Sequence, residues 1–173
     1  MVMYRNNMPL HSAEEIGYHL GLVLPPERSN LFCNVRTTLE RPSAGYGIQM
    51  HLPEFEPNAA FARMRIPLHF SVEPIKGFSS ANDLLERLKV IESENLDALV
   101  AFNYEALLDD ASLNGAHHAC VFDRIIDGRV RLIDPSFYAP KWRIFDVEQL
   151  FFAMQKHVSS DHGGIWLLAK TSN

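Results

Sequence analysis

A chain of 173 residues, 47% hydrophobic and 21% charged, is long enough to bury one substantial core, and we expect a single domain over residues 1–173. The net charge of -5, with 16 Lys and Arg scattered along the chain, excludes the basic patch typical of proteins that bind nucleic acid or anionic membranes. No apolar stretch approaches the roughly 20 residues that span a bilayer, and the first residues do not read as a signal peptide, so we expect a cytoplasmic protein.

N-terminal capping signals predict four helices in this chain. Ser12 opens a capping box for a helix that runs to about Leu22, and Ser29 starts a second helix. Two more helices are expected to begin at Ser80 and Asp146, because apolar residues at helical spacing follow each of them.

Five short apolar segments bounded by turn residues predict strands at 68–72, 98–102, 117–125, 129–134 and 165–169. Helices therefore come early in the chain, and a sheet rich in hairpins comes late. This order is typical of an α+β domain with an antiparallel sheet, and it disfavours alternating βαβ units.

Two of these strands form a predicted β-hairpin around Gly128, and the length of its turn decides which residues share a face. A two-residue turn pairs residues whose numbers sum to 255 and puts His118 and Asp134 on opposite faces. A three-residue turn, with Gly128 at positive φ as a bulge, changes the sum to 254. That register gathers His118, Cys120 and Asp134 with apolar residues on one face and leaves the charged residues on the other. We therefore predict the three-residue turn.

In that register Asp134 is a diagonal neighbour of His118, about 7 Å away between Cα atoms and within side-chain reach. A carboxylate that accepts from one imidazole nitrogen fixes the tautomer and leaves the other nitrogen free as a base, as in catalytic triads. The alternative is structural, with His118 as a core histidine and Asp134 initiating the turn before Pro135. The spacing alone leaves both interpretations open.

The segment HACVFDRIIDGRVRLIDPSFYAPKWRIFDVEQLFFAM has a His that opens one strand and an Asp-Pro that closes the next. It resembles the C-terminal half of papain-like cysteine peptidases of the bacteriocin-leader-processing (double-glycine) type and of their butirosin-type acyltransferase relatives. The resemblance covers roughly residues 80–170 and includes NDLLERLKVIESENLDALVAFNY, similar to the helix and buried strand of the family. It implies a papain-like fold, with N-terminal helices packed on a C-terminal antiparallel sheet, in which His118 is the catalytic His and Asp134 orients it.

The nucleophile is not specified by the resemblance. In the family a Cys opens the first long helix about six residues after a Gln, and this chain has no such pair. Cys33 is one candidate, because it would lie in the first turn of the second predicted helix, where the dipole lowers a thiol pKa. Ser12 at the start of the first helix is another, although capping alone explains it. Cys120 is expected to face the core and to serve packing. The alternative for Cys33 is also structural, as a small buried hydrophobic residue.

We expect no metal and no cofactor. The histidines at 51, 69, 157 and 162 are isolated, and His117 and His118 point to opposite faces of one strand. Gln49, in a loop expected to enter a strand, is a candidate hydrogen-bond donor at the site. Two functions remain open. One is a cysteine-peptidase-like or acyl-transfer enzyme acting on a peptide or acyl-carrier thioester, and the other is an inactive papain-like module that binds a peptide or a partner protein.

Overall fold

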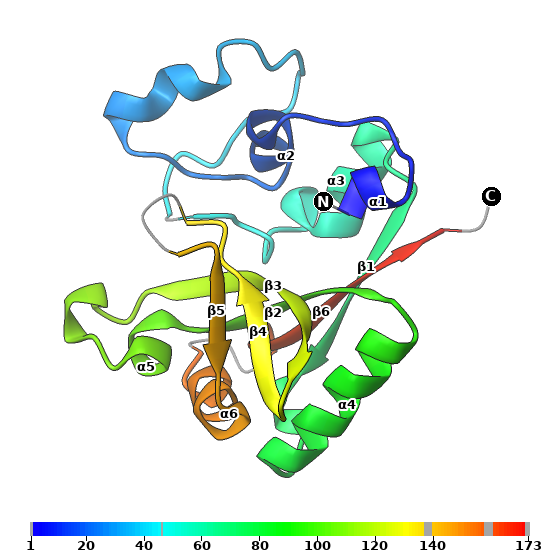
Figure 1. Cartoon of the computed structure of the whole chain (residues 1–173). Helices are drawn as coiled ribbons and strands as arrows, with labels where there is room; N and C mark the ends of the chain where they lie inside the picture. The colour runs from blue at the N-terminus through cyan, green and yellow to red at the C-terminus, as the bar shows by residue number, and fades with distance from the viewer. Residues whose placement is uncertain (1, 46, 137–139, 158–160, 172–173) are drawn as a thin grey trace. The chain divides into compact units, whose positions relative to one another are not determined.

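The computed structural model describes residues 2–45, 47–136, 140–157 and 161–171, and its contacts divide the chain into two compact units (Figure 1). The N-terminal unit comprises Met1–Phe70 with Lys170–Asn173, and the C-terminal unit comprises Ser71–Ala169. The chain passes from one unit to the other within the first strand, β1 (Leu68–Pro74).

Short helices make up most of the regular structure in the N-terminal unit. Ser12 caps α2 by accepting a hydrogen bond from the amide of Glu15 at 3.0 Å, as the capping box predicts. The helix ends at His19, short of the predicted Leu22, because Gly21 turns the chain with a φ of +68°. The helices of this unit are α1 (Val2–Arg5), α2 (Ala13–His19), α3 (Pro57–Met64) and the 3₁₀ helices η1 (Pro26–Phe32) and η2 (Pro53–Phe55).

The second predicted helix, from Ser29, is wrong. The chain forms only the 3₁₀ helix η1 there, and the described residues from 33 to 45 contain no α-helix. Asn and Thr are frequent in this stretch, and their side chains compete for backbone hydrogen bonds. Thr37 shows this competition directly, because its hydroxyl accepts a hydrogen bond from the amide of Leu39 at 3.1 Å.

The C-terminal unit is centred on a six-stranded sheet with the order β1-β6-β2-β3-β4-β5 (Figure 1). Antiparallel pairs join β6 to β2, β2 to β3, β3 to β4 and β4 to β5. All five predicted strands are present, and the α+β class is confirmed. The strands after β1 are β2 (Asp97–Asn103), β3 (His117–Ile126), β4 (Arg129–Ile133), β5 (Trp142–Phe145), which the sequence did not predict, and β6 (Gly164–Lys170).

Two predicted helices, α4 (Ala81–Ser93) and α6 (Val147–Gln155), pack against one face of this sheet (Figure 1). Ser80 caps α4 by accepting from the amide of Asp83, as predicted. Asp146 precedes α6 as predicted but makes no side-chain cap. The remaining helices of the unit are η3 (Ile75–Gly77), α5 (Tyr104–Leu108) and η4 (Ala111–Leu113). The shared core includes Leu84, Leu88 and Ile91 of α4, Leu150 and Met154 of α6, and Val100, Phe102, Cys120 and Leu132 of the sheet.

The turn between β3 and β4 has two residues, so the predicted three-residue turn is wrong. Asp127 and Gly128 both adopt positive φ, at 50° and 76°, as a type I′ turn requires. Next to this turn Ile125 pairs with Val130, so that paired positions sum to 255. Gly128 does have the predicted positive φ, but as part of the tight turn and not as a bulge.

A bulge farther along β3 restores the predicted register. The ladder shifts between Phe122 and Arg124, leaving Asp123 as the extra residue. Beyond the bulge Phe122 pairs with Leu132, and paired positions sum to 254. The face predicted for His118 is therefore correct, although the bulge produces it and the turn does not.

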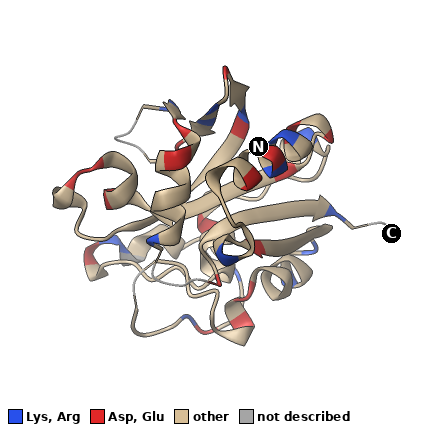
Figure 2. Cartoon of the chain, turned by 90° about the horizontal axis from the view of Figure 1, so that it is seen from below, with Lys and Arg blue, Asp and Glu red and all other residues tan. Residues whose placement is uncertain are grey.

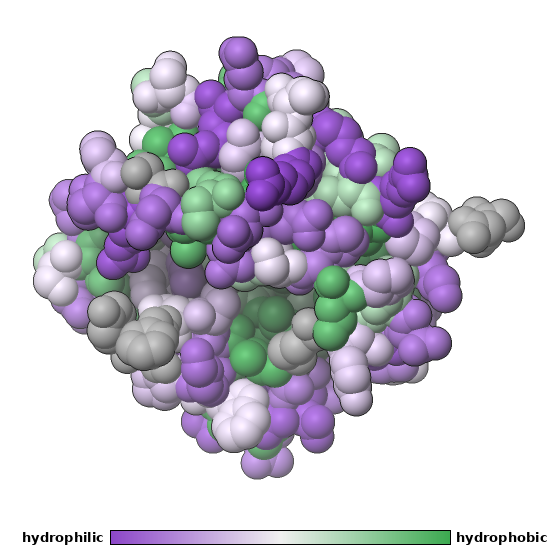
Figure 3. Space-filling view, turned by 90° about the horizontal axis from the view of Figure 1, so that it is seen from above, coloured by the Kyte–Doolittle hydropathy of each residue, from purple (hydrophilic) through white to green (hydrophobic). Residues whose placement is uncertain are grey.

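Charges of both signs are interspersed along the ribbon in Figure 2, without a block of either sign. Hydrophilic residues cover most of the face seen in Figure 3, where apolar residues gather in separate small areas. Among the described residues, no helix has both the length and the apolar character needed to cross a membrane.

Candidate active site

Three side chains of the C-terminal unit converge at one end of the sheet. His118 is the second residue of β3, and Asp134 directly follows β4. Tyr104 directly follows β2 and begins α5. Because β2 and β4 both run antiparallel to β3, the start of β3 lies at the ends of its two neighbours.

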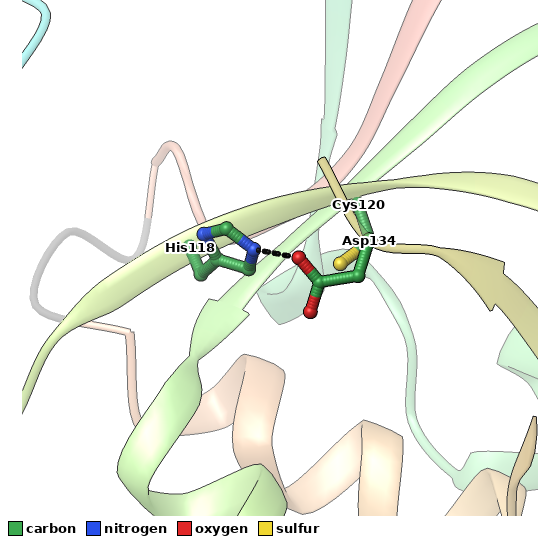
Figure 4. A group of neighbouring side chains, drawn as sticks. All are labelled: His118, Cys120 and Asp134. Atoms are coloured by element: carbon green, nitrogen blue, oxygen red, sulfur yellow. Dashed lines mark hydrogen bonds and ion pairs between the residues drawn. The ribbon is translucent and has the colours of Figure 1, made fainter. Parts of the chain in front are cut away.

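His118 and Asp134 form the predicted pair. Nε2 of His118 lies 2.9 Å from Oδ1 of Asp134 (Figure 4). An ionised carboxylate only accepts, so Nε2 carries the proton and Nδ1 is left with a lone pair. Nδ1 points away from Asp134 in Figure 4 and has no hydrogen-bond partner among the described residues. The imidazole is thus held in the tautomer that a general base needs.

The Asp134 carboxylate is held by three donors and is only 1% exposed. Oδ1 accepts from His118 and from the amide of Ser136 at 2.8 Å, and Oδ2 accepts from the Tyr104 hydroxyl at 2.6 Å. Burial alone would raise the pKa of Asp134, but hydrogen bonds from Tyr104, His118 and Ser136 outweigh it and keep the pKa below its ordinary value. The carboxylate is therefore ionised at neutral pH.

Tyr104 holds the pair from a second side. Its ring stacks on the imidazole of His118, with 4.5 Å between centroids and 27° between planes. Burial, together with the hydrogen bond to Asp134, raises the pKa of Tyr104 to about 12, so the hydroxyl remains a donor at neutral pH. Sequence reasoning missed this residue. Its one local signal is Asn103, which caps α5 and so fixes the turn that points Tyr104 at the site.

Cys120 shares the face of the pair but is only 2% exposed. Burial, and then the charge of Asp134, raise the pKa of its thiol to about 12, which keeps it protonated. Donor atoms of His118, Cys120 and Asp134 lie within 4.8 Å of one another, and these three residue types could ligate a transition metal. Both oxygens of Asp134 also accept hydrogen bonds from protein donors.

The other predicted site residues belong to the N-terminal unit. Cys33 is exposed and ends the 3₁₀ helix η1, so it does not lie in the first turn of an α-helix as predicted. Ser12 is a helix cap. Gln49 is 7% exposed, and its side chain donates to the carbonyl of Gly47 at 3.2 Å. The strand expected after this loop does not form in the described residues 47–52, where Gly47 makes an isolated bridge with Val23.

Comparison with protein-family models, with curated proteins and with solved structures finds no match for this chain.

Proposed function

We propose that this protein is a papain-like acyl-transfer enzyme or peptidase, in which His118 is the general base, Asp134 orients it and Cys33 is the nucleophile. The observation that carries the proposal is the 2.9 Å hydrogen bond between His118 and a buried, ionised Asp134, with the opposite ring nitrogen left unpaired among the described residues. A histidine that served packing alone would not need a buried carboxylate held by two further donors.

The proposed reaction has two steps. Nδ1 of His118 takes the proton from the Cys33 thiol, and the thiolate attacks the carbonyl of a peptide or thioester. The leaving amine or thiol takes the proton from the imidazolium, and a thioester remains on Cys33. In the second step His118 takes a proton from water or from an acceptor amine, which releases the acyl group and restores the thiol.

Cys33 is the thiol that suits this role. It is exposed, whereas the buried thiol of Cys120 is kept protonated by its raised pKa. Cys120 also adjoins the carboxylate that holds Nε2, whereas the lone pair that acts as base is on Nδ1 (Figure 4). These two facts favour Cys33 over the other cysteine of the chain.

Trapping of the acyl-enzyme tests the proposal. The protein is incubated with p-nitrophenyl acetate and digested, and mass spectrometry locates the acetyl group. We expect one acetyl group on Cys33, and its rate of formation should fall by about 10²-fold or more in His118→Gln. His117→Gln is the matched control, because His117 is the preceding residue of the same strand. Acetylation that is absent, lies on another residue or does not depend on His118 would overturn the proposal.

A non-catalytic papain-like module that binds a peptide is the second candidate. It is favoured by the local structure of Cys33, which ends a 3₁₀ helix and does not lie at the N-terminus of an α-helix. The same trapping experiment separates the two functions. A binding module would leave Cys33 unmodified by the ester while still folding with an intact His118–Asp134 pair.

A further inference from the structure

Arg143 is a cationic side chain on the same face of the sheet as the His118–Asp134 pair. It lies in β5 opposite Leu132 of β4, and cross-strand partners share a face. Leu132 is buried in the core, and Asp134 lies two residues farther along. Since alternate residues of a strand share a face, Arg143 and Asp134 point to the same side.

Arg143 is half-buried, and one donor of its guanidinium has no partner. Its Nε is buried without a hydrogen-bond partner, and no carboxylate of the described residues pairs with it. Its Cζ lies 5.8 Å from the centroid of the Tyr104 ring. By comparison, Arg87 is paired with Glu73 and Arg131 with Asp123.

A buried donor without an acceptor is unfavourable and calls for an explanation. Asp134 does not supply the acceptor, because its oxygens accept from Tyr104, His118 and Ser136 and no hydrogen bond joins it to Nε of Arg143. Tyr104 is in contact with both the imidazole and the guanidinium, since its ring stacks on His118 and also lies against Arg143. A ligand that reaches His118 would therefore meet an unpaired guanidinium close by.

We propose that Arg143 binds a carboxylate of the substrate, so that the acyl compound processed at His118 is anionic. Guanidinium presents a planar fork of N–H donors that matches a carboxylate, and such charge-assisted bonds are strong where water is excluded. That this carboxylate belongs to a substrate rests on the proposed function, whereas the binding of a carboxylate at Arg143 does not. The alternative to ligand binding is that Arg143 serves only to offset the charge of Asp134 at a distance.

NMR of the Arg Nε–H groups tests the binding directly. The protein is titrated with glutarate, and with glutaramide as the neutral match. We expect glutarate to shift the Nε–H resonance of Arg143 in a saturable manner, because a carboxylate bound by the guanidinium changes the surroundings of its Nε–H. The resonance of Arg131, which is already paired with Asp123, is the internal control and should stay in place. A resonance of Arg143 that does not move, or that moves equally with glutaramide, would overturn the proposal.

Kinetics test the preference for an anionic acyl group. The ratio of kcat/KM for p-nitrophenyl hemiglutarate to that for p-nitrophenyl butyrate is measured in wild type, Arg143→Gln, Arg143→Lys and Arg131→Gln. We expect Arg143→Gln to lower the ratio by about tenfold or more, Arg143→Lys to lower it less, and Arg131→Gln to preserve it.

The titration and the kinetic experiment can fail independently of each other. If wild type cleaves neither ester, the proposed function is wrong, and the Nε–H titration alone decides whether Arg143 binds a carboxylate. If wild type cleaves both esters and Arg143→Gln leaves the ratio unchanged, the enzyme stands and the role of Arg143 is wrong.

Discussion

The ring of Tyr104 stacks on the imidazole of His118, and the two residues donate to opposite oxygens of one carboxylate. Stacking limits the rotation of the imidazole, while the shared acceptor limits its translation. Asp134 is in turn fixed by its backbone, because its amide donates to the carbonyl of Lys141 at 2.9 Å. The orientation of the base thus depends on the end of β2, the start of β3 and the end of β4, as well as on the hydrogen bond between His118 and Asp134.

Removal of the Tyr104 hydroxyl should destabilise the fold without loss of the stack. In Tyr104→Phe, Oδ2 of Asp134 loses its donor while still buried, and this costs about 1–3 kcal/mol of the free energy of unfolding. Urea denaturation measures the loss. Tyr18→Phe, whose hydroxyl donates to the carbonyl of Leu39 in the other unit, is the matched control with an expected cost near 1 kcal/mol. Equal costs in the two variants would argue against a charged acceptor at Tyr104.

Asp134 should make stability depend on pH in the acid range. Its pKa is lower in the folded state than its ordinary value of 3.8, so its contribution is fully present above that value and is lost as pH falls through the folded pKa. We expect Asp134→Asn to cost about 2 kcal/mol at neutral pH and progressively less towards about pH 3. Denaturation at several pH values measures this, with exposed Asp109→Asn as control. A cost that does not change with pH would contradict an ionised Asp134.

The two cysteines should differ in reactivity. We expect iodoacetamide to alkylate exposed Cys33 in the folded protein and to leave Cys120 unmodified, because that thiol is buried and its pKa is raised to about 12. His118→Ala should slow the reaction of Cys33 if the imidazole accepts its proton, and His117→Ala should not. Peptide mapping after timed alkylation gives both rates. Reaction of Cys33 at the rate of denatured protein, or indifference to His118→Ala, would leave the binding module as the better account.

The tight turn of the hairpin should depend on glycine. Gly128→Ala places a Cβ at a φ of +76° and is expected to cost about 1–2 kcal/mol of unfolding free energy, although no atom lies within 4 Å of the new methyl group. Asp127→Asn is the control, because Asn-Gly suits a type I′ turn at least as well as Asp-Gly. Thermal denaturation compares the two. If Gly128→Ala were neutral, the positive φ would be wrong.

The hairpin shows how far sequence reasoning reached. Segregation of charged and apolar residues predicted that His118 and Asp134 share a face, and this is correct because burial of the apolar set dictates the face. The predicted turn was wrong because the prediction assumed one unbroken register along the whole hairpin. A bulge at Asp123 allows a two-residue turn and the apolar face to coexist, with Cys120, Phe122 and Ile125 all directed at the core.

Other features depend on contacts that are distant in the sequence. The pairing of Tyr104 with Asp134 joins residues thirty positions apart and requires β2 and β4 to flank β3. Strand β5 has only four residues and pairs at the edge, so its pattern is too short to read alone. The helix expected from Ser29 failed for the opposite reason, because local side-chain competition outweighed an apolar periodicity of moderate strength.

The tautomer of His118 tests the central claim most directly. Long-range ¹H–¹⁵N spectra at mildly alkaline pH distinguish the two nitrogens of each neutral imidazole, and His117 provides an internal reference. We expect the proton of His118 to reside on Nε2, because that nitrogen donates to Asp134, and we expect Asp134→Asn to weaken this preference. A His118 proton on Nδ1, or an averaged pair of signals in wild type, would contradict a base that Asp134 holds ready to accept a proton.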